Sequence, residues 1–319
     1  MRIFALLSLA AWATGCQKFT NVDEACKDKV SGEKHLSHAS SVDAVARLNC
    51  YRRLARVGVL SIDRTVQEVT EDHVAYMLGL DDLSGYIPGQ EQSDQVGFTG
   101  TDLNSRLEAK NYSQVVGTLD RWELTPVRWP LNGRDNIDYL FPDPWVRQLY
   151  LQPLVIGAGF DEGLSKSELD GGWLSYLTIL YDSSMTVAPF VYPVDGQIDV
   201  DPSYTDEIQG GALGQYGEVG FPITLFLNSP VPVLKDYSLR GPDGNVEVVI
   251  HLPGDVSWGA ALSGTIAITP LDPLEGDATY TFTSEVEMDG QVVRLDSTFT
   301  TASKTSRPSF YSGTSTTYR

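Results

Sequence analysis

The chain has 319 residues, 42% of them hydrophobic, and its 42 acidic and 23 basic residues give a formal net charge of −19. This length is enough for about two domains with buried cores. The acidic surface repels phosphate backbones and no cluster of Lys or Arg interrupts it, so nucleic acid is an unlikely class of partner. Such a surface keeps an exported protein soluble.

Residues 1–15 have the features of an export signal. Met1-Arg2 supplies a positive start, residues 3–13 form an apolar run too short to span a membrane, and small residues precede Cys16. The Ala-Thr-Gly-Cys ending resembles a lipobox, in which the cysteine carries acyl chains, although the usual Leu is missing. This resemblance implies a lipid anchor at the cell envelope, on the outer membrane or the cell surface, and plain secretion is the alternative. No later segment is apolar for long enough to be a transmembrane helix.

Three cysteines are awkward for an exported protein unless one has another use. If Cys16 carries the lipid, Cys26 and Cys50 remain as an even pair, and an oxidising compartment favours a disulfide between them. Closing a loop of about 24 residues contributes roughly 3 kcal/mol in the chain-entropy model and ties an N-terminal arm to the first helix. We expect residues 16–40, which are polar and aperiodic, to be a tether, with His35 and His38 solvated rather than bound to a metal.

Two amphipathic helices are predicted after the tether. The first begins at Ser40 or Ser41, stops at Gly58, and has an apolar stripe of Val42, Val45, Leu48, Tyr51 and Ala55. The second ends near Gly79, and its inner face holds Val66, Val69, His73, Tyr76, Met77 and Leu80. A long polar stretch then runs to about Asn136. Asp143-Pro144 predicts the start of a short helix, and residues 154–156 and 176–181 are predicted strands.

Beyond about Met185 the helical pattern gives way to short strands separated by turns. Turn signals occur at residues 193–196, 240–245 and 289–290. The strands between them are predicted at 224–227, 246–252, 265–268, 280–286 and 292–300. This spacing is typical of a β-sandwich. Residues 303–319 are rich in Ser and Thr and are predicted to be a disordered tail.

Residues 42–181 resemble the bacterial branch of the CAP (SCP/PR-1-like, cysteine-rich secretory protein) superfamily. The resemblance rests on the order of several short motifs: Asn49-Cys50-Tyr51-Arg52, Gly58-Val59-Leu60, His73-Val74-Ala75-Tyr76-Met77, Gly97-Phe98-Thr99-Gly100, Arg106 with Tyr112, Pro144-Trp145-Val146-Arg147 and Gly157-Ala158-Gly159. It implies an α-β-α sandwich with a central groove, in which the Gly-Ala-Gly strand makes a close approach.

The second part resembles the bacterial Ig-like modules that often follow such a domain. The matching segments are 192–196, 220–224, 269–274, Thr279-Tyr280 and 298–301. The expected architecture is therefore an α+β, CAP-like domain over residues 41–185, followed by an all-β Ig-like sandwich over residues 186–302.

Many CAP grooves hold a divalent cation between two His and two acidic residues, and the resemblance implies that this set is eroded here. Val146 stands at one His position, Val115 or Val116 at one Glu position, and only Glu91 remains near the other acid. We therefore expect no metal and no cofactor. Glu91 and His73 are weak catalytic candidates: His73 is expected to be packed in the core, and Glu91 to be a solvated loop residue. Arg147 is expected to pair with a carboxylate such as Asp143.

These observations favour an exported surface lipoprotein with a non-catalytic CAP-like domain that binds an extracellular ligand, either a small molecule, a lipid or an envelope component. Its attachment to the membrane is expected through the N-terminal lipid. Three alternatives stay open: a hydrolase with an acid-based groove site around Glu91, a lipid- or sterol-binding protein, and a structural spacer or adhesin. The sequence contains no Gly-x-Ser-x-Gly elbow, no His-Glu-x-x-His, no phosphate-binding glycine loop and no reactive cysteine pair, so an enzyme is the less favoured class.

Overall fold

A computed structural model describes the chain in several stretches. These are residues 19–26, 39–80, 90–112, 118–125, 133–153, 155–164, 173–181, 188–205, 217–227, 229, 231–253 and 264–303. The export signal, Cys16, the two histidines of the expected tether, Val115, Val116 and residues 304–319 lie outside these stretches. The described residues form a mixed α+β protein, as the sequence predicts.

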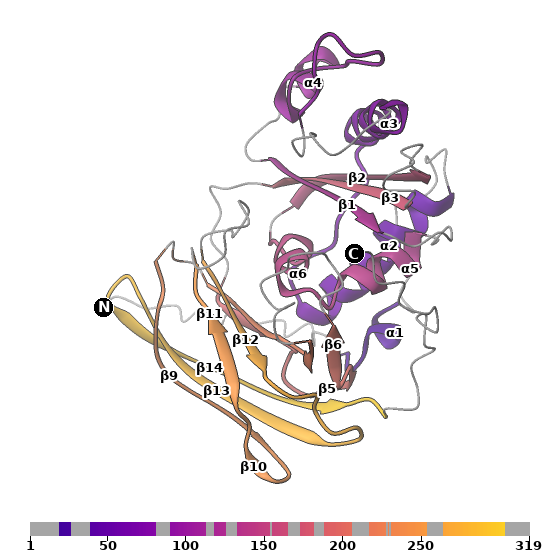
Figure 1. The fold of residues 1–319 in the computed structure, drawn as a ribbon. Helices are drawn as coiled ribbons and strands as arrows, with labels where there is room; N and C mark the ends of the chain where they lie inside the picture. Colours follow the sequence, from indigo (N-terminus) through magenta and orange to yellow (C-terminus); the bar gives the residue numbers. More distant parts are fainter. Residues whose placement is uncertain are drawn as a thin grey trace, which may run out of the picture.

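The first part of the chain is a three-layered body (Figure 1). Its middle layer is an antiparallel sheet in the order β1-β3-β2, formed by β1 (Thr118–Thr125), β2 (Val155–Leu164) and β3 (Trp173–Tyr181). Helices α3 (Arg64–Gly79) and α4 (Leu103–Ala109) lie over one face of this sheet, whereas α2 (Ala39–Ala55), α5 (Gly133–Leu140) and α6 (Pro144–Tyr150) lie under the other. The short helix α1 (Val22–Ala25) packs beside α2.

Local signals account for the helix boundaries. Asp63 caps α3 by accepting hydrogen bonds from the backbone N–H groups of Thr65 and Val66, and Asp143 caps α6 in the same way. Helix α3 ends at Gly79 and α6 begins at Pro144, as predicted. By contrast, α2 begins at Ala39, ahead of the predicted cap.

The Gly-Ala-Gly segment of β2 makes the close approach that the family resemblance implies. A Cβ atom on Gly159 would lie 2.5 Å from the hydroxyl oxygen of Thr70 and 2.8 Å from the backbone oxygen of Val66. Because both contacts belong to α3, only glycine lets this helix lie directly on the strand.

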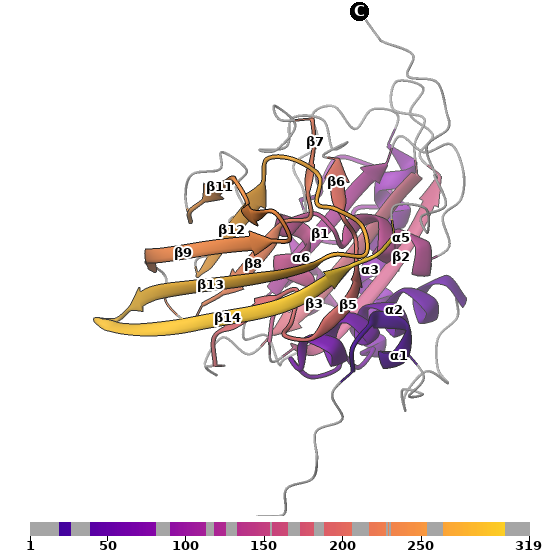
Figure 2. The ribbon, with the colours of Figure 1, turned by 90° about the horizontal axis from the view of Figure 1, so that it is seen from below.

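Two sheets face each other in the second part of the chain (Figure 2). One has the order β10-β9-β13-β14-β5 and the other β11-β12-β8-β4, and β6 and β7 form a separate pair. The strands are β4 (Phe190–Tyr192), β5 (Gln197–Val200), β6 (Ser203–Thr205), β7 (Glu218–Gly220), β8 (Ile223–Phe226), β9 (Val233–Gly241), β10 (Gly244–Asn245), β11 (Val248–His251), β12 (Thr265–Pro270), β13 (Thr279–Met288) and β14 (Gln291–Thr301). All five predicted strands are present, as β8 and β11 to β14.

The two parts share one hydrophobic core. Val146 and Leu149 of α6 belong to the same buried cluster as Ile223 and Leu225 of β8. The predicted division at residues 185 and 186 is therefore crossed by continuous packing of buried side chains. Whether each part folds alone stays a prediction.

The structure differs from the sequence analysis in two regions of the chain. The polar stretch before Asn136 contains α4 and β1, and α5 begins within it. These elements are short, and their apolar residues are too few to set a period. Within the expected tether, residues 19–26 are folded: α1 has an Asn21 N-cap, and Ala25 is buried. The disulfide supplies the physical reason, because it holds this arm against α2.

Candidate functional site

His73 and Glu91 meet in the interior of the first part. His73 lies on α3, and its Nδ1 atom is 2.7 Å from the Oε1 atom of Glu91, which precedes the Gly97–Gly100 turn. Both side chains are completely buried. The prediction that His73 is packed and hydrogen-bonded is confirmed. The prediction that Glu91 is a solvated loop residue is wrong, because the loop folds back over α3 and encloses the carboxylate.

Both carboxylate oxygens of Glu91 accept hydrogen bonds from the end of its own loop. The Thr99 hydroxyl donates to Oε1 over 2.9 Å, and the backbone N–H groups of Thr99 and Gly100 donate to Oε2. The Arg106 guanidinium of α4 lies 3.8 Å from Oε1. Glu91 therefore joins three segments: α3 through His73, the loop through Thr99, and α4 through Arg106.

Aromatic rings complete the enclosure. The ring of Tyr176, on β3, packs edge-on against His73 at a centroid distance of 4.7 Å. The hydroxyl of Tyr76 accepts a hydrogen bond from the backbone N–H of Gln92, the residue after Glu91. Gly97 has a φ of +88°, a left-handed conformation that glycine adopts without strain and that turns the loop back.

The pKa directions agree with a neutral imidazole beside an ionised carboxylate. Burial lowers the pKa of His73, and the charge of Arg106 adds to this effect, while Glu91 opposes it. Burial raises the pKa of Glu91, but the hydrogen bonds from His73 and Thr99 outweigh it, so the pKa lies below its ordinary value. Such a pair can orient a general base in an enzyme, yet a general base must touch its substrate. With no exposed surface, this pair holds the loop in place.

The cation site that the family resemblance implies does not fit the residues that are present. Val146 is an apolar residue fully buried in α6. Nowhere in the described stretches do three or more His, Cys, Asp or Glu residues gather as a metal would require. No chemical step can be built through a metal at this place.

The prediction that Arg147 pairs with a carboxylate such as Asp143 is wrong. The Arg147 guanidinium is fully buried and donates hydrogen bonds to the backbone oxygen of Pro222 and the hydroxyl of Thr224. Asp143 supplies no such bond, although its charge favours the cationic form of Arg147. The ring of Phe221 lies 4.7 Å from the guanidinium carbon. Arg147 therefore fastens α6 to β8 and does not brace its own helix.

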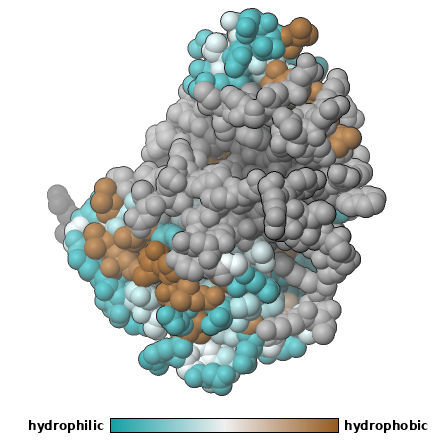
Figure 3. All heavy atoms as spheres, viewed as in Figure 1, coloured by the Kyte–Doolittle hydropathy of each residue, from teal (hydrophilic) through white to brown (hydrophobic). Residues whose placement is uncertain are grey.

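An exposed apolar band lies on the face of the sandwich that Figure 3 draws. Figure 3 shows apolar residues gathered over the part of the molecule where β9 and β11 lie in the same view. Three large exposed residues lie at the ends of these strands: Val231, two residues before β9, is 76% exposed, Val233 at the start of β9 is 45% exposed, and Leu252, directly after β11, is 39% exposed. Soluble monomers rarely leave such residues in one contiguous patch without a role in binding.

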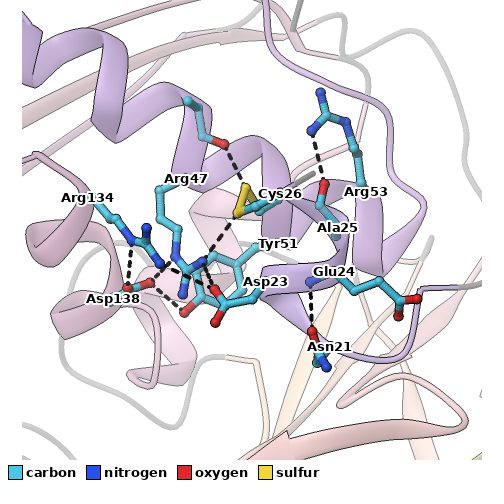
Figure 4. Close-up of polar contacts among 12 residues, drawn as sticks. Asn21, Asp23, Glu24, Ala25, Cys26, Arg47, Tyr51, Arg53, Arg134 and Asp138 are labelled. Atoms are coloured by element: carbon cyan, nitrogen blue, oxygen red, sulfur yellow. Dashed lines mark hydrogen bonds and ion pairs between the residues drawn. A yellow bond between two sulfur atoms is a disulfide. The ribbon is translucent and has the colours of Figure 1, made fainter. Parts of the chain in front are cut away.

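A second charged cluster lies around the disulfide between Cys26 and Cys50, which the sequence predicts and the structure confirms (Figure 4). Arg47 of α2 contacts Asp23 over 2.8 Å, Asp138 of α5 over 2.5 Å, and the sulfur of Cys26 over 3.3 Å. Sequence reasoning missed Arg47 and Asp138, because they are 91 residues apart and no local pattern links them.

The described residues thus provide a buried hydrogen-bonded cluster around Glu91, an outer cluster of ion pairs around Arg47, and an exposed apolar band. None of the helices described is both long enough and apolar enough to cross a bilayer. No known protein-family model matches the chain, and no curated protein matches its sequence at a significant level.

Proposed function

We propose that this chain is an exported lipoprotein, anchored at the cell envelope through Cys16, whose CAP-like and Ig-like domains bind an extracellular ligand without catalysis. One observation carries the non-catalytic part of the proposal. His73 and Glu91, the best candidates for groove chemistry, are both completely buried, and the carboxylate oxygens of Glu91 accept hydrogen bonds from Thr99 and Gly100. A structural role accounts for the contacts of this carboxylate with His73, Thr99, Gly100 and Arg106.

The test compares the unmodified protein with Glu91→Gln, which keeps the shape of the side chain. Both proteins are assayed on ester, glycoside and phosphodiester substrates, with and without Mg²⁺, Mn²⁺ or Zn²⁺. We expect no turnover by either protein. Turnover that Glu91→Gln abolishes, with the circular dichroism spectrum unchanged, would instead favour the hydrolase alternative.

The apolar band is the surface that we propose for ligand binding. Val231→Glu places a charge two residues before β9, at the most exposed of the large apolar residues in the second part, and Val96→Glu is the matched control, since Val96 is 93% exposed and belongs to the first part. The probes are isolated peptidoglycan sacculi, a fluorescent sterol and a fluorescent fatty acid. We expect saturable binding of one probe that Val231→Glu weakens and Val96→Glu leaves unchanged. Equal binding by both variants would contradict this assignment.

An adhesin is the second candidate, and the same band favours it. Contiguous exposed apolar side chains are also what a protein partner would cover. Attachment of protein-coated beads to whole cells distinguishes the two candidates: an adhesin retains the beads on cells, whereas a small-molecule binder gives retention no greater than that of Val231→Glu.

A further inference from the structure

The N-terminal arm, residues 19–26, is fixed to both parts of the molecule. The backbone oxygen of Thr20 accepts a hydrogen bond of 2.7 Å from the N–H of Ile198 on β5. The side chains of Phe19 and Val22 pack against the shared hydrophobic core. At the other end of the arm, the disulfide joins Cys26 to Cys50 of α2. The arm is therefore attached to the folded body from Phe19 onward.

The arm is also braced within itself. The Asn21 side chain caps α1 by accepting a hydrogen bond from the backbone N–H of Glu24. Glu24 in turn accepts two hydrogen bonds from Thr20, one from its backbone N–H and one from its hydroxyl. Asp23 pairs with Arg47 of α2, as Figure 4 shows. These contacts leave little freedom between Thr20 and Cys26.

The connection between Cys16 and this arm is short. Only two residues, Gln17 and Lys18, lie between Cys16 and Phe19, and the three Cα–Cα steps from Cys16 to Phe19 span at most about 11 Å. We propose that the arm holds the folded body in a fixed orientation against the lipid headgroups, with the α1 side toward the bilayer. This inference rests on the lipid at Cys16 in the proposed function.

The orientation places the proposed binding surface on the outer side. The turn between β13 and β14 lies at the end of the molecule opposite α1 in both ribbon views (Figures 1 and 2). Strands β9 and β11, where the apolar band lies, are also on the side away from α1. A rigid arm would therefore present the band to the exterior, whereas a tether of 25 residues would let it turn toward the bilayer.

The charges near the arm favour the short connection, and not attraction, as the cause of this orientation. Asp23 is exposed, and so are Asp195, two residues before β5, and Asp199 within that strand, whereas the neighbouring Arg134 is paired with Asp23. Carboxylates are repelled by anionic headgroups. Vesicles of phosphatidylcholine, which have no net charge, therefore isolate the effect of the arm.

The experiment measures the distance of two labelled sites from the bilayer. Ile198→Cys lies beside the arm and Val292→Cys at the far turn, and both positions are exposed. Each full-length lipoprotein carries one donor fluorophore and is reconstituted in phosphatidylcholine vesicles that contain an acceptor-labelled lipid. We expect energy transfer from position 198 to exceed that from position 292 several-fold.

A matched variant lengthens the connection without touching the arm. A flexible Gly-Ser insertion of about 20 residues between Lys18 and Phe19 has a root-mean-square length of about 25 Å. In this variant we expect energy transfer from position 198 and from position 292 to become nearly equal. Equal transfer in the parent protein, with lipid found on Cys16 by mass spectrometry, would overturn the orientation and leave the anchor intact. Absence of lipid on Cys16 would overturn both.

Discussion

The two charged clusters of this molecule have similar ionic partners but very different surroundings. In the enclosed cluster the side chains of His73 and Glu91 are 0% exposed and that of Arg106 is 1%. In the outer cluster Arg47 is 10% exposed and Asp23 is 75%. An ion pair in water contributes little, but breaking a buried one leaves a charge with neither water nor partner. Removing a charged side chain should therefore lower the free energy of unfolding more in the enclosed cluster than in the outer one.

Removal of the buried carboxylate should have the largest effect. Glu91→Ala removes the hydrogen bond to His73 and the ion pair with Arg106, and it takes away the acceptor of the N–H groups of Thr99 and Gly100. We expect the free energy of unfolding to fall by about 3–5 kcal/mol, measured by urea denaturation. Glu108→Ala, at an exposed position on α4, is the control and should change it by less than about 0.5 kcal/mol. A loss below about 1 kcal/mol for Glu91→Ala would remove the contrast between the clusters.

The disulfide should provide most of the stability of the outer cluster. Replacing Cys26 and Cys50 by Ser opens a loop with a sequence separation of 24 residues. We expect the free energy of unfolding to fall by roughly 3 kcal/mol, as chain entropy predicts. Chemical reduction of the unmodified protein is the independent control and should give a similar loss. Unchanged stability after reduction would mean that the ion pairs hold the arm without the covalent bond.

Acidification should weaken the enclosed cluster in two steps. The pKa of His73 is lowered in the folded protein, so the unfolded chain takes up its proton first as the pH falls below about 6.5. The pKa of Glu91 is also lowered, so a further loss begins below about 4.5. The free energy of unfolding should therefore decline on going from pH 7.5 to pH 5.5. In His73→Gln this decline should be smaller. The same slope in both proteins would show that other groups cause it.

The sequence predicts the elements of the fold more completely than the contacts between them. Caps and apolar periods locate α3 and α6, and alternation with turn signals locates β8 and the strands β11 to β14. These signals act over a few residues. The sequence predicts that Arg147 pairs with Asp143, four residues away, but the side chain that accepts its hydrogen bonds is that of Thr224, 77 residues further along. Such a contact depends on how α6 packs against β8, and local propensity does not encode this.

The candidate site shows the same limit. The helical spacing of the apolar residues predicts that His73 lies on the inner face of α3, and the structure places it there. Glu91 has no such period around it, and its burial follows from a loop that ends in the donors Thr99 and Gly100. A buried His requires a hydrogen-bond partner, and this requirement is the one signal that could have pointed to the acid.

The smallest effect is expected at the most exposed member of the outer cluster. The hydrogen bond and charge of Arg47 lower the pKa of Asp23, although partial burial opposes them. Since the carboxylate is 75% exposed, solvent screens the pair, and Asp23→Asn should reduce the free energy of unfolding by at most about 1 kcal/mol. The difference from the unmodified protein should shrink further in 1 M salt. A loss as large as that of Glu91→Ala would mean that the arm depends on charge and not on the disulfide, and the comparison between the clusters would fail.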